Sequence, residues 1–290
     1  MTSPSPTTTP LRPSPAVERP RGGRAQAVLT VQRTEQIGPH LVRVVLGGDG
    51  FADVRDNAFT DKYVKIMFTD PALGLTPPYD LEALREQLAP DQLPVRRTYT
   101  VRRLDPDVQE LTIDFVTHGD EGVAGPWARA AQPGDLIALS GAGGGYSPDP
   151  TADWHLFVGD DTAVPAISSA VEALAADAVG VVLLEVDGPA DEVPVATPAG
   201  VSLRWLHRAG ATPGATSLLP AGVQELDWPT GRAQVFAHGE RGAMKALRAV
   251  FAHRAVPRAD LSLSGYWAFG RNEDRFQAEK REPIGQIFPD

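Results

Sequence analysis

The segment 95–103 places arginine, tyrosine and threonine side chains at the spacing of a β-strand. Its Val, Thr and Tyr content favours extended backbone, and alternation then puts Arg97 and Tyr99 on one face and Thr100 on the other. A guanidinium can form a bidentate contact with a phosphate, and a phenol ring can stack on a flat aromatic cofactor. A small hydroxyl or a backbone N–H can bond to the N5 region of a flavin, where hydride arrives. The segment therefore suits flavin binding, although an edge strand with solvated arginines explains the same residues.

A glycine-rich run at 118–128 is the second segment whose residues suit ligand binding. Its glycines allow close approach of the backbone, and Pro126 suits the first turn of a short helix. The N–H groups of a helix start lack partners within the helix and can hold a diphosphate. A glycine-rich connection without a ligand is the alternative, and His118 equally fits a loop histidine bonded to the backbone.

Two further turns follow predicted strands. The first, 159–167, departs from the G-x-G-x-x-G pattern and carries Asp160 and Asp161, which would repel a pyrophosphate. Thr162 can cap the following helix, and the two acids can do the same. The second turn, 238–245, is again a strand, a glycine and a helix. These turns allow nucleotide binding without proving it.

Composition limits the classes of function. The chain has 290 residues, which suggests two domains, and it has no cysteine, which excludes disulfides, thiolate metal sites and redox dithiols. Its six histidines show no metal-ligand spacing, so we expect no protein metal site. A net charge of −10 disfavours nucleic-acid binding. We find neither a membrane span nor a signal peptide, and we expect a cytoplasmic monomer.

The elements that must position these residues form two groups. Strands are predicted at 25–33, 40–46, 62–69, around Arg97, at 111–117 and at 135–140, which indicates a closed antiparallel barrel of six strands. The segment 71–90 interrupts the predicted barrel strands and contains a short helical patch. Beyond a glycine- and proline-rich hinge, apolar strands alternate with helices, which indicates a parallel sheet covered on both faces. Ligands of such sheets bind at the carboxyl ends of the strands.

These groups give the expected domain boundaries. Residues 1–24 are rich in Pro, Ser and Thr and are predicted to be disordered. The barrel domain is predicted at 25–148 and the α/β domain at 149–270. Residues 271–290 form a polar tail, interpreted as a terminal helix, a lid or a disordered end. Within it, Ile284, Ile287 and Phe288 suggest that part of the tail docks.

Taken together, five motifs resemble the siderophore-interacting protein family, ferric-siderophore reductases related to ferredoxin–NADP reductases. They are Arg97-x-Tyr99-Thr100 and the segments 118–128, 159–167, 238–242 and 264–268. Their order and spacing are specific, and the actinobacterial branch is the most similar. Asp161 stands where the family usually has Glu, and Gly125 where some relatives have a hydroxyl side chain.

The resemblance implies a barrel that binds FAD, followed by a domain that binds a nicotinamide nucleotide. Tyr99 and Thr100 would be catalytic. FAD would be held by Arg97, Tyr99 and Thr100, with its diphosphate near His118, Gly119, Gly122 and Ala124. NADPH or NADH would dock near Asp160, Thr162, Ala163, Pro165, Gly239 and Glu240. The implied activity passes electrons from NAD(P)H through flavin to Fe(III) in a ferric siderophore, releasing Fe(II).

Charge suggests where substrates would bind. A ferric siderophore is often anionic, so its site should be basic. The candidates are Lys62, Lys65, Arg102, Arg103, Lys280 and Arg281, although each also fits a solvated surface charge. Arg208 follows the strand at 201–206 and would contact the 2′-phosphate of NADPH, which predicts a modest preference for that donor. Lys245 or Arg248 would serve the same phosphate equally well.

Two other functions fit the same residues. One is a protein that binds a siderophore or a flavin without turnover, and the other is a flavin reductase that serves a different electron acceptor.

Overall fold

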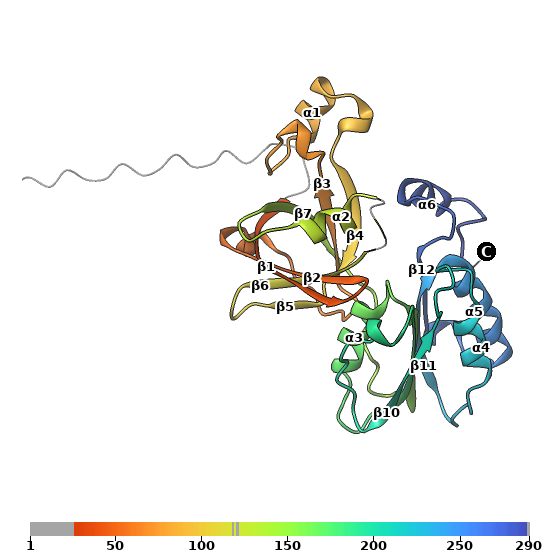
Figure 1. The fold of residues 1–290 in the computed structure, drawn as a ribbon. Helices are drawn as coiled ribbons and strands as arrows, with labels where there is room; N and C mark the ends of the chain where they lie inside the picture. Colours follow the sequence, from red (N-terminus) through yellow and green to blue (C-terminus); the bar gives the residue numbers. More distant parts are fainter. Residues whose placement is uncertain (1–25, 118, 120–121, 289–290) are drawn as a thin grey trace, which may run out of the picture.

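The computed structural model describes residues 26–117, 119 and 122–288. Two predictions, the disordered segment 1–24 and the contact of His118 with a diphosphate, fall outside these residues. Figure 1 shows two units, an antiparallel barrel and an α/β domain, with the C-terminal segment returning toward the barrel. Within the described residues, no helix combines the length and the apolar composition needed to cross a bilayer.

The N-terminal unit is an antiparallel sheet with strand order β4-β3-β7-β1-β2-β6-β5. Its strands are β1 (Gln26–Gly38), β2 (Leu41–Gly47), β3 (Tyr63–Phe68), β4 (Val95–Thr100), β5 (Arg103–Asp105), β6 (Glu110–Val116) and β7 (Leu136–Gly143). All six predicted strands are present, and β5 is an additional short one. The sheet closes because Val101 donates its N–H to Lys62 at 2.7 Å while Arg102 donates its N–H to Thr112 at 2.9 Å.

Alternating apolar residues fill the barrel. Leu29, Val44 and Ile113 come from three different strands and are fully buried. Helix α2 (Ala124–Ala130) contributes Trp127, whose ring centroid lies 5.5 Å from that of Phe115. The barrel core therefore holds α2 against β6.

The predicted excursion between β3 and β4 carries α1 (Leu81–Gln87), whose first turn is capped by the Asp80 carboxylate. Short 3₁₀ helices lie at Asp49–Asp53, Pro71–Leu73, Pro90–Gln92, Pro189–Asp191 and Arg258–Asp260.

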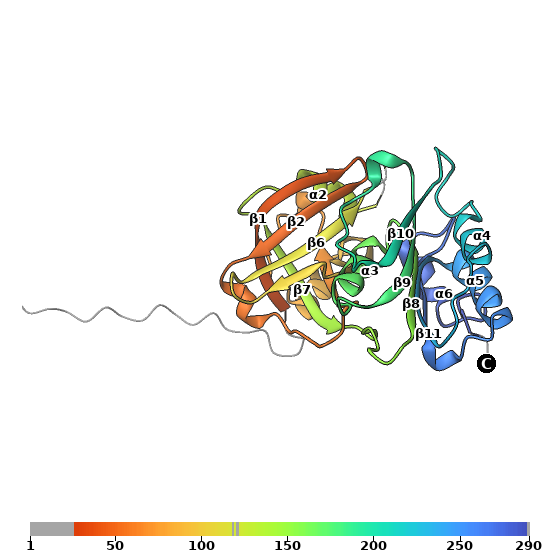
Figure 2. The same ribbon diagram turned by 90° about the horizontal axis from the view of Figure 1, so that it is seen from below.

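The second unit is a parallel sheet with strand order β10-β9-β8-β11-β12. The strands are β8 (Trp154–Asp160), β9 (Val179–Val186), β10 (Gly200–His207), β11 (Ala233–Glu240) and β12 (Leu261–Trp267). Helix α3 (Val164–Glu172) covers one face, and α4 (Leu218–Gln224) and α5 (Arg241–His253) cover the other. Figure 2 shows this layering, with α3 on the side of the barrel. The predicted parallel sheet is thus confirmed.

Burial on both faces explains the apolar composition of these strands. Leu156 and Val158 face α4 and α5, whereas Phe157 faces α3, and all three are fully buried. The strand order reverses between β8 and β11, so their carboxyl ends flank the crevice where such sheets bind ligands.

The C-terminal segment docks on the α/β domain through Ile287 and Phe288, whereas Ile284 is exposed. Lys245 and Arg248 of α5 donate to the carbonyl oxygens of Ile284 and Ile287, at 2.6 and 2.7 Å. Before this docked end, α6 (Glu273–Glu279) lies near β4 of the barrel (Figure 1). The tail therefore contains one helix and contacts both domains.

Candidate flavin and nucleotide site

The carboxyl ends of β8, β11 and β12 are tied together by one carboxylate. Asp160 accepts hydrogen bonds from the Glu240 N–H at 2.7 Å and the Trp267 indole N–H at 2.9 Å. It also accepts the N–H of Thr162 at 3.0 Å and the Thr162 hydroxyl. Asp160 therefore holds the three strand ends and the turn before α3 in one arrangement.

The environment of Asp160 changes its acidity. Burial, reinforced by the charge of Asp161, raises the pKa of Asp160 to about 7, although its hydrogen bonds oppose the shift. Gly239 must be a glycine here, because its φ is +151° and a Cβ would lie 2.6 Å from the Asp160 carboxylate.

At the neighbouring position of the same edge, His238 contacts β12. Its Nδ1 lies 3.0 Å from the Tyr266 hydroxyl, and its Nε2 lies 3.0 Å from the Ser262 hydroxyl. The imidazole is buried, and burial lowers the pKa of His238 to about 3, so the ring is neutral at physiological pH.

The barrel meets this edge of the sheet at Thr100. Its hydroxyl lies near the Tyr266 phenol and opposes the rise in the pKa of that phenol. Residues 166 positions apart are thereby brought close together at the end of β4, the strand with the predicted flavin motif. The end of the predicted flavin strand and the carboxyl edge of the parallel sheet are therefore neighbours.

On β4, the alternation predicted from the sequence is present. Tyr99 packs inward, with its ring centroid 4.4 Å from that of Phe115, and it remains only half-buried. Burial raises the pKa of Tyr99, which keeps the phenol neutral. The Arg97 guanidinium donates to the exposed Asp274 carboxylate of α6 at 3.0 Å and to the Arg96 carbonyl at 3.0 Å. Arg97 therefore already binds an anionic group.

The loop before α2 also fits a phosphate-bearing cofactor. Gly119 and Gly122 have φ values of +54° and +77°, and a Cβ built on either would meet no atom within 4 Å. Open space beside the backbone is what close approach of a diphosphate requires. Ala124 begins α2, and no side chain caps that helix. These residues and the cation of Arg97 are compatible with FAD.

The residues predicted to bind the nicotinamide nucleotide lie at the crevice between β8 and β11. Thr162 is hydrogen-bonded to Asp160 and does not cap α3, so the cap expected from the sequence is absent. Ala163 occupies the N-cap position of α3, and Pro165 lies in its first turn. Glu240 caps α5 by accepting the Ala243 N–H at 2.8 Å, and it also accepts the Phe269 N–H at 3.0 Å. Asp160 and Glu240 thus shape the crevice through bonds to the protein.

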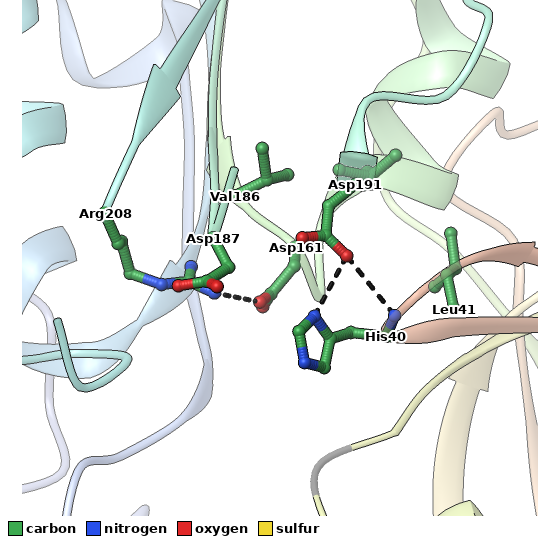
Figure 3. Close-up of a pocket in the computed structure, with 8 residues that line it drawn as sticks. His40, Leu41, Asp161, Val186, Asp187, Asp191 and Arg208 are labelled. Atoms are coloured by element: carbon green, nitrogen blue, oxygen red, sulfur yellow. Dashed lines mark hydrogen bonds and ion pairs between the residues drawn. The ribbon is translucent and has the colours of Figure 1, made fainter. Parts of the chain in front are cut away.

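Arg208 lies elsewhere than expected. It is buried, donates to the Asp161 carboxylate at 2.8 Å and lies 3.7 Å from Glu185. Figure 3 shows it in a pocket between the domains, opposite His40 and Asp191. The guanidinium is thus paired with buried acids, which argues against the predicted contact with a 2′-phosphate. The reason is that two buried acids needed a cation, which the sequence pattern did not reveal.

The same pocket brings His40, Asp187 and Asp191 together, with ligand atoms within 4.8 Å of one another. Protein partners account for this grouping. His40 Nδ1 lies 2.9 Å from Asp191, and Asp187 accepts the Gly210 N–H at 3.1 Å. The His40–Asp191 contact connects the β1–β2 turn to the α/β domain.

The predicted basic residues separate into two sets. Lys62 pairs with Asp56, Arg102 with Glu172 and Arg103 with Asp105. Lys65 instead donates to the Thr98 hydroxyl at 3.1 Å, and Arg281 is exposed on the tail. Burial, with help from the nearby charge of Lys65, lowers the pKa of Lys280, whereas Glu273 opposes the shift. Lys65 and Lys280 therefore concentrate positive charge beside β4.

Sequence reasoning missed four contributors to the site. Tyr266 and Trp267 lie in the 264–268 motif, which carried no residue assignment, and His238 was seen only as part of a turn. Asp274 had no signal at all, because its role depends on how the tail folds back onto β4.

The fold and the site together define a two-domain protein. A barrel of the type that binds flavin is followed by a parallel sheet of the type that binds nucleotides. Residues 30–146 match the siderophore-interacting FAD-binding domain, and residues 152–270 match the siderophore-interacting protein family. The chain is 41% identical to the uncharacterized protein Rv2895c of Mycobacterium tuberculosis, over 90% of this chain and 96% of that one. It is 32% identical, with the same coverage, to the ferric vibriobactin reductase ViuB of Vibrio cholerae.

A solved structure agrees with these matches. The siderophore utilization protein from T. fusca superposes with a TM-score of 0.76 at 36% identity, covering 86% of this chain and 94% of that one. The chain belongs to the siderophore-interacting protein family.

Proposed function

We propose that this protein is an FAD-dependent reductase that uses NADPH or NADH to reduce Fe(III) in a ferric siderophore, releasing Fe(II). The observation that carries the proposal is the junction where Thr100 and Tyr266 lie close together. There the predicted flavin strand meets the carboxyl edge of the parallel sheet, where a nucleotide would bind. Hydride donor and flavin would therefore meet at this junction.

Bound flavin would supply the conversion from a two-electron donor to a one-electron acceptor. The chain's own residues hold and orient the reactants. Arg97 and the backbone at Gly119 and Gly122 would hold the phosphates, with His118 and Ala124 beside them. Tyr99 and Thr100 would contact the reactive ring, and Thr162, Ala163, Pro165 and Gly239 would border the nicotinamide nucleotide.

The substrate would bind near Lys65 and Lys280, because their concentrated positive charge suits an anionic iron complex. Siderophores hold iron with hard oxygen ligands. Fe(II) is softer and binds such ligands less well, so reduction loosens the complex. The reaction therefore needs no metal ligand from the protein.

An anaerobic titration tests the proposal. The purified protein is loaded with FAD, reduced with NADPH or NADH, and then mixed with a ferric siderophore while flavin absorbance is recorded. Bleaching followed by stoichiometric reoxidation is expected. A protein that binds flavin but is not bleached would be a binding protein. A protein that is bleached but not reoxidised by the iron complex would be a flavin reductase for another acceptor.

Charge reversal tests the substrate site. Lys65→Glu and Lys280→Glu should each raise KM for an anionic ferric siderophore by about tenfold, the equivalent of roughly 1.4 kcal/mol, with little change in flavin reduction. Arg85→Glu, an exposed cation on α1, is the matched control and should leave KM unchanged. Equal effects of all three substitutions would contradict a local site. The cytoplasmic location and the monomeric state remain predictions.

A further inference from the structure

The linker between the two domains, residues 144–153, is hydrogen-bonded to the barrel at its first half. The buried Asp61 carboxylate accepts the N–H groups of Gly145 and Tyr146, at 2.8 and 2.9 Å. Thr60 donates its N–H to the Tyr146 carbonyl oxygen at 2.8 Å. The linker backbone is therefore fixed to the segment that precedes β3, and it cannot swing away without leaving these polar groups unpaired.

The second half of the linker is fixed to the α/β domain by one side chain of β11. Gln234 Oε1 accepts the Asp149 N–H at 2.7 Å and the Tyr146 hydroxyl at 3.2 Å. Its Nε2 donates to the Ser147 carbonyl oxygen at 3.1 Å. Gln234 thus uses both ends of its amide to hold three successive parts of the linker.

Tyr146 belongs to both domains at once. Its backbone is bonded to the barrel segment, whereas its ring is buried in the core of the α/β domain. There the ring packs edge-on against Phe236 and Phe157, with centroid distances of 4.8 and 6.1 Å. Because protein cores are close-packed, a rotation of one domain against the other would have to withdraw this ring or break the backbone bonds.

The linker starts beside the predicted flavin strand. Tyr63 of β3 pairs with Gly143, the last residue of β7, on one side and with Thr100 of β4 on the other. A Cβ at Gly143 would lie 2.0 Å from the Tyr63 ring, so the glycine is required for this close packing. Only one residue therefore separates the start of the linker from the end of the flavin motif.

We propose that Asp61, Tyr146 and Gln234 form an interdomain clamp that holds the nucleotide domain in one orientation against the flavin barrel. They are positioning residues for hydride transfer, and the proposal rests on the proposed function. Hydride transfer needs the reacting atoms roughly 3–3.5 Å apart, and a misplacement of about 1 Å can cost on the order of 100-fold in rate. A hinge needs residues that are free to change their backbone angles, and the clamp removes that freedom from the linker.

A distance measurement on the flavin-free protein tests the clamp. The chain has no cysteine, so Thr34→Cys on β1 and Ala252→Cys on α5, both exposed positions, place one spin label in each domain. Pulsed electron paramagnetic resonance should give one narrow distance distribution in this background. Adding Asp61→Ala or Gln234→Met should broaden it, because each removes the bonds on one side of the linker.

Two further variants separate the clamp from general effects of substitution. Asp61→Asn keeps an oxygen that accepts both N–H groups, so its distribution should stay narrow. Asp135→Ala is the matched control, because the Asp135 carboxylate accepts the Gln132 N–H at 2.8 Å within the barrel. It should also leave the distribution narrow.

Rapid-mixing kinetics test the role in hydride transfer. With FAD bound, Asp61→Ala and Gln234→Met should retain wild-type affinities for FAD and for NADPH or NADH. Flavin bleaching at saturating donor should be about tenfold or more slower in both. Asp61→Asn and Asp135→Ala should bleach at the wild-type rate.

A narrow distribution in both Asp61→Ala and Gln234→Met, or a broad one in the parent protein, would overturn the clamp. If Asp61→Ala fails to fold, Gln234→Met alone decides in the same way. Slow bleaching in Asp61→Asn with a narrow distribution would show that the Asp61 charge acts directly, and it would overturn the positioning role. A parent protein that binds FAD but is not bleached would overturn the proposed function instead, while the distances still decide whether the clamp exists.

Discussion

The Arg97 guanidinium of β4 donates to the Asp274 carboxylate of α6 at 3.0 Å, across 177 positions of the chain. The Arg97 side chain is 19% exposed and that of Asp274 is 74% exposed, so the carboxylate approaches from solvent. The cation proposed to hold a flavin phosphate is thus covered by an anion from the tail. Cofactor and tail would compete for the same guanidinium.

This competition predicts opposite effects of two substitutions on FAD affinity. Arg97→Ala should weaken binding by about tenfold or more, because a charge-assisted hydrogen bond is worth roughly 1.5–3 kcal/mol. Asp274→Asn should tighten binding a few fold, because the competing charge is removed. Isothermal titration with FAD measures both, and Glu282→Gln, an exposed acid of the same tail, is the control. Weaker binding in Asp274→Asn would show that the tail supports the cofactor.

Arg208 should matter for stability more than for the choice of nucleotide. Its removal leaves Asp161 and Glu185 buried without this cation, and breaking such a pair typically costs about 3–5 kcal/mol. Urea unfolding of Arg208→Ala should show that loss, whereas Arg204→Ala, on the exposed side of β10, should change stability little. The ratio of kcat/KM for NADPH and NADH should be the same in both variants. A selective loss of NADPH use in Arg208→Ala would contradict this assignment.

Asp160 should make stability depend on pH. Its pKa is raised in the folded state, so the folded protein binds a proton that the unfolded chain releases near pH 4. Stability from this group is therefore complete below about pH 4 and falls as the pH rises toward about 7, where the folded carboxyl also ionises. Asp160→Asn should remove this fall. The check is the melting temperature of both proteins between pH 4 and 8, and parallel curves would contradict the shift.

Glu279 should show the opposite dependence. Its carboxylate forms ion pairs with Arg241, Arg271 and Arg275, at 2.8, 2.7 and 3.0 Å. The contacts with these arginines, with Arg241 first, lower the pKa of Glu279 to about 2. The docking of α6 should therefore be strongest above the ordinary carboxyl range and weaken as the pH falls toward about 2.

Limited proteolysis of the tail measures this docking. Glu279→Gln should expose the tail to cleavage at neutral pH, and the difference from wild type should shrink as the pH is lowered with an acid-tolerant protease. Gln277→Ala, on the same helix, is the control. A tail that stays protected in Glu279→Gln would mean that apolar docking by Ile287 and Phe288 is sufficient.

Short-range patterns in the sequence were enough to predict the architecture. Alternation over two residues marked the barrel strands, and apolar runs such as 179–186 marked strands buried on both faces. The absence of cysteine, the flavin motif at Arg97, Tyr99 and Thr100, and the strand–glycine–helix turns indicated a cofactor-binding protein of two domains. These features are local, because a strand's side-chain period and a turn's glycine act within a few residues.

Only the tertiary structure decided which of these residues meet. Whether Arg208 faced a phosphate or Asp161, whether Arg97 was covered by Asp274, and how Thr100 reached Tyr266 all depend on packing between distant segments. A charged side chain takes the nearest partner that offsets its desolvation, and sequence spacing does not reveal that partner. The same holds for His238, whose neutral state follows from burial between two strands and from no feature of its neighbours in the sequence.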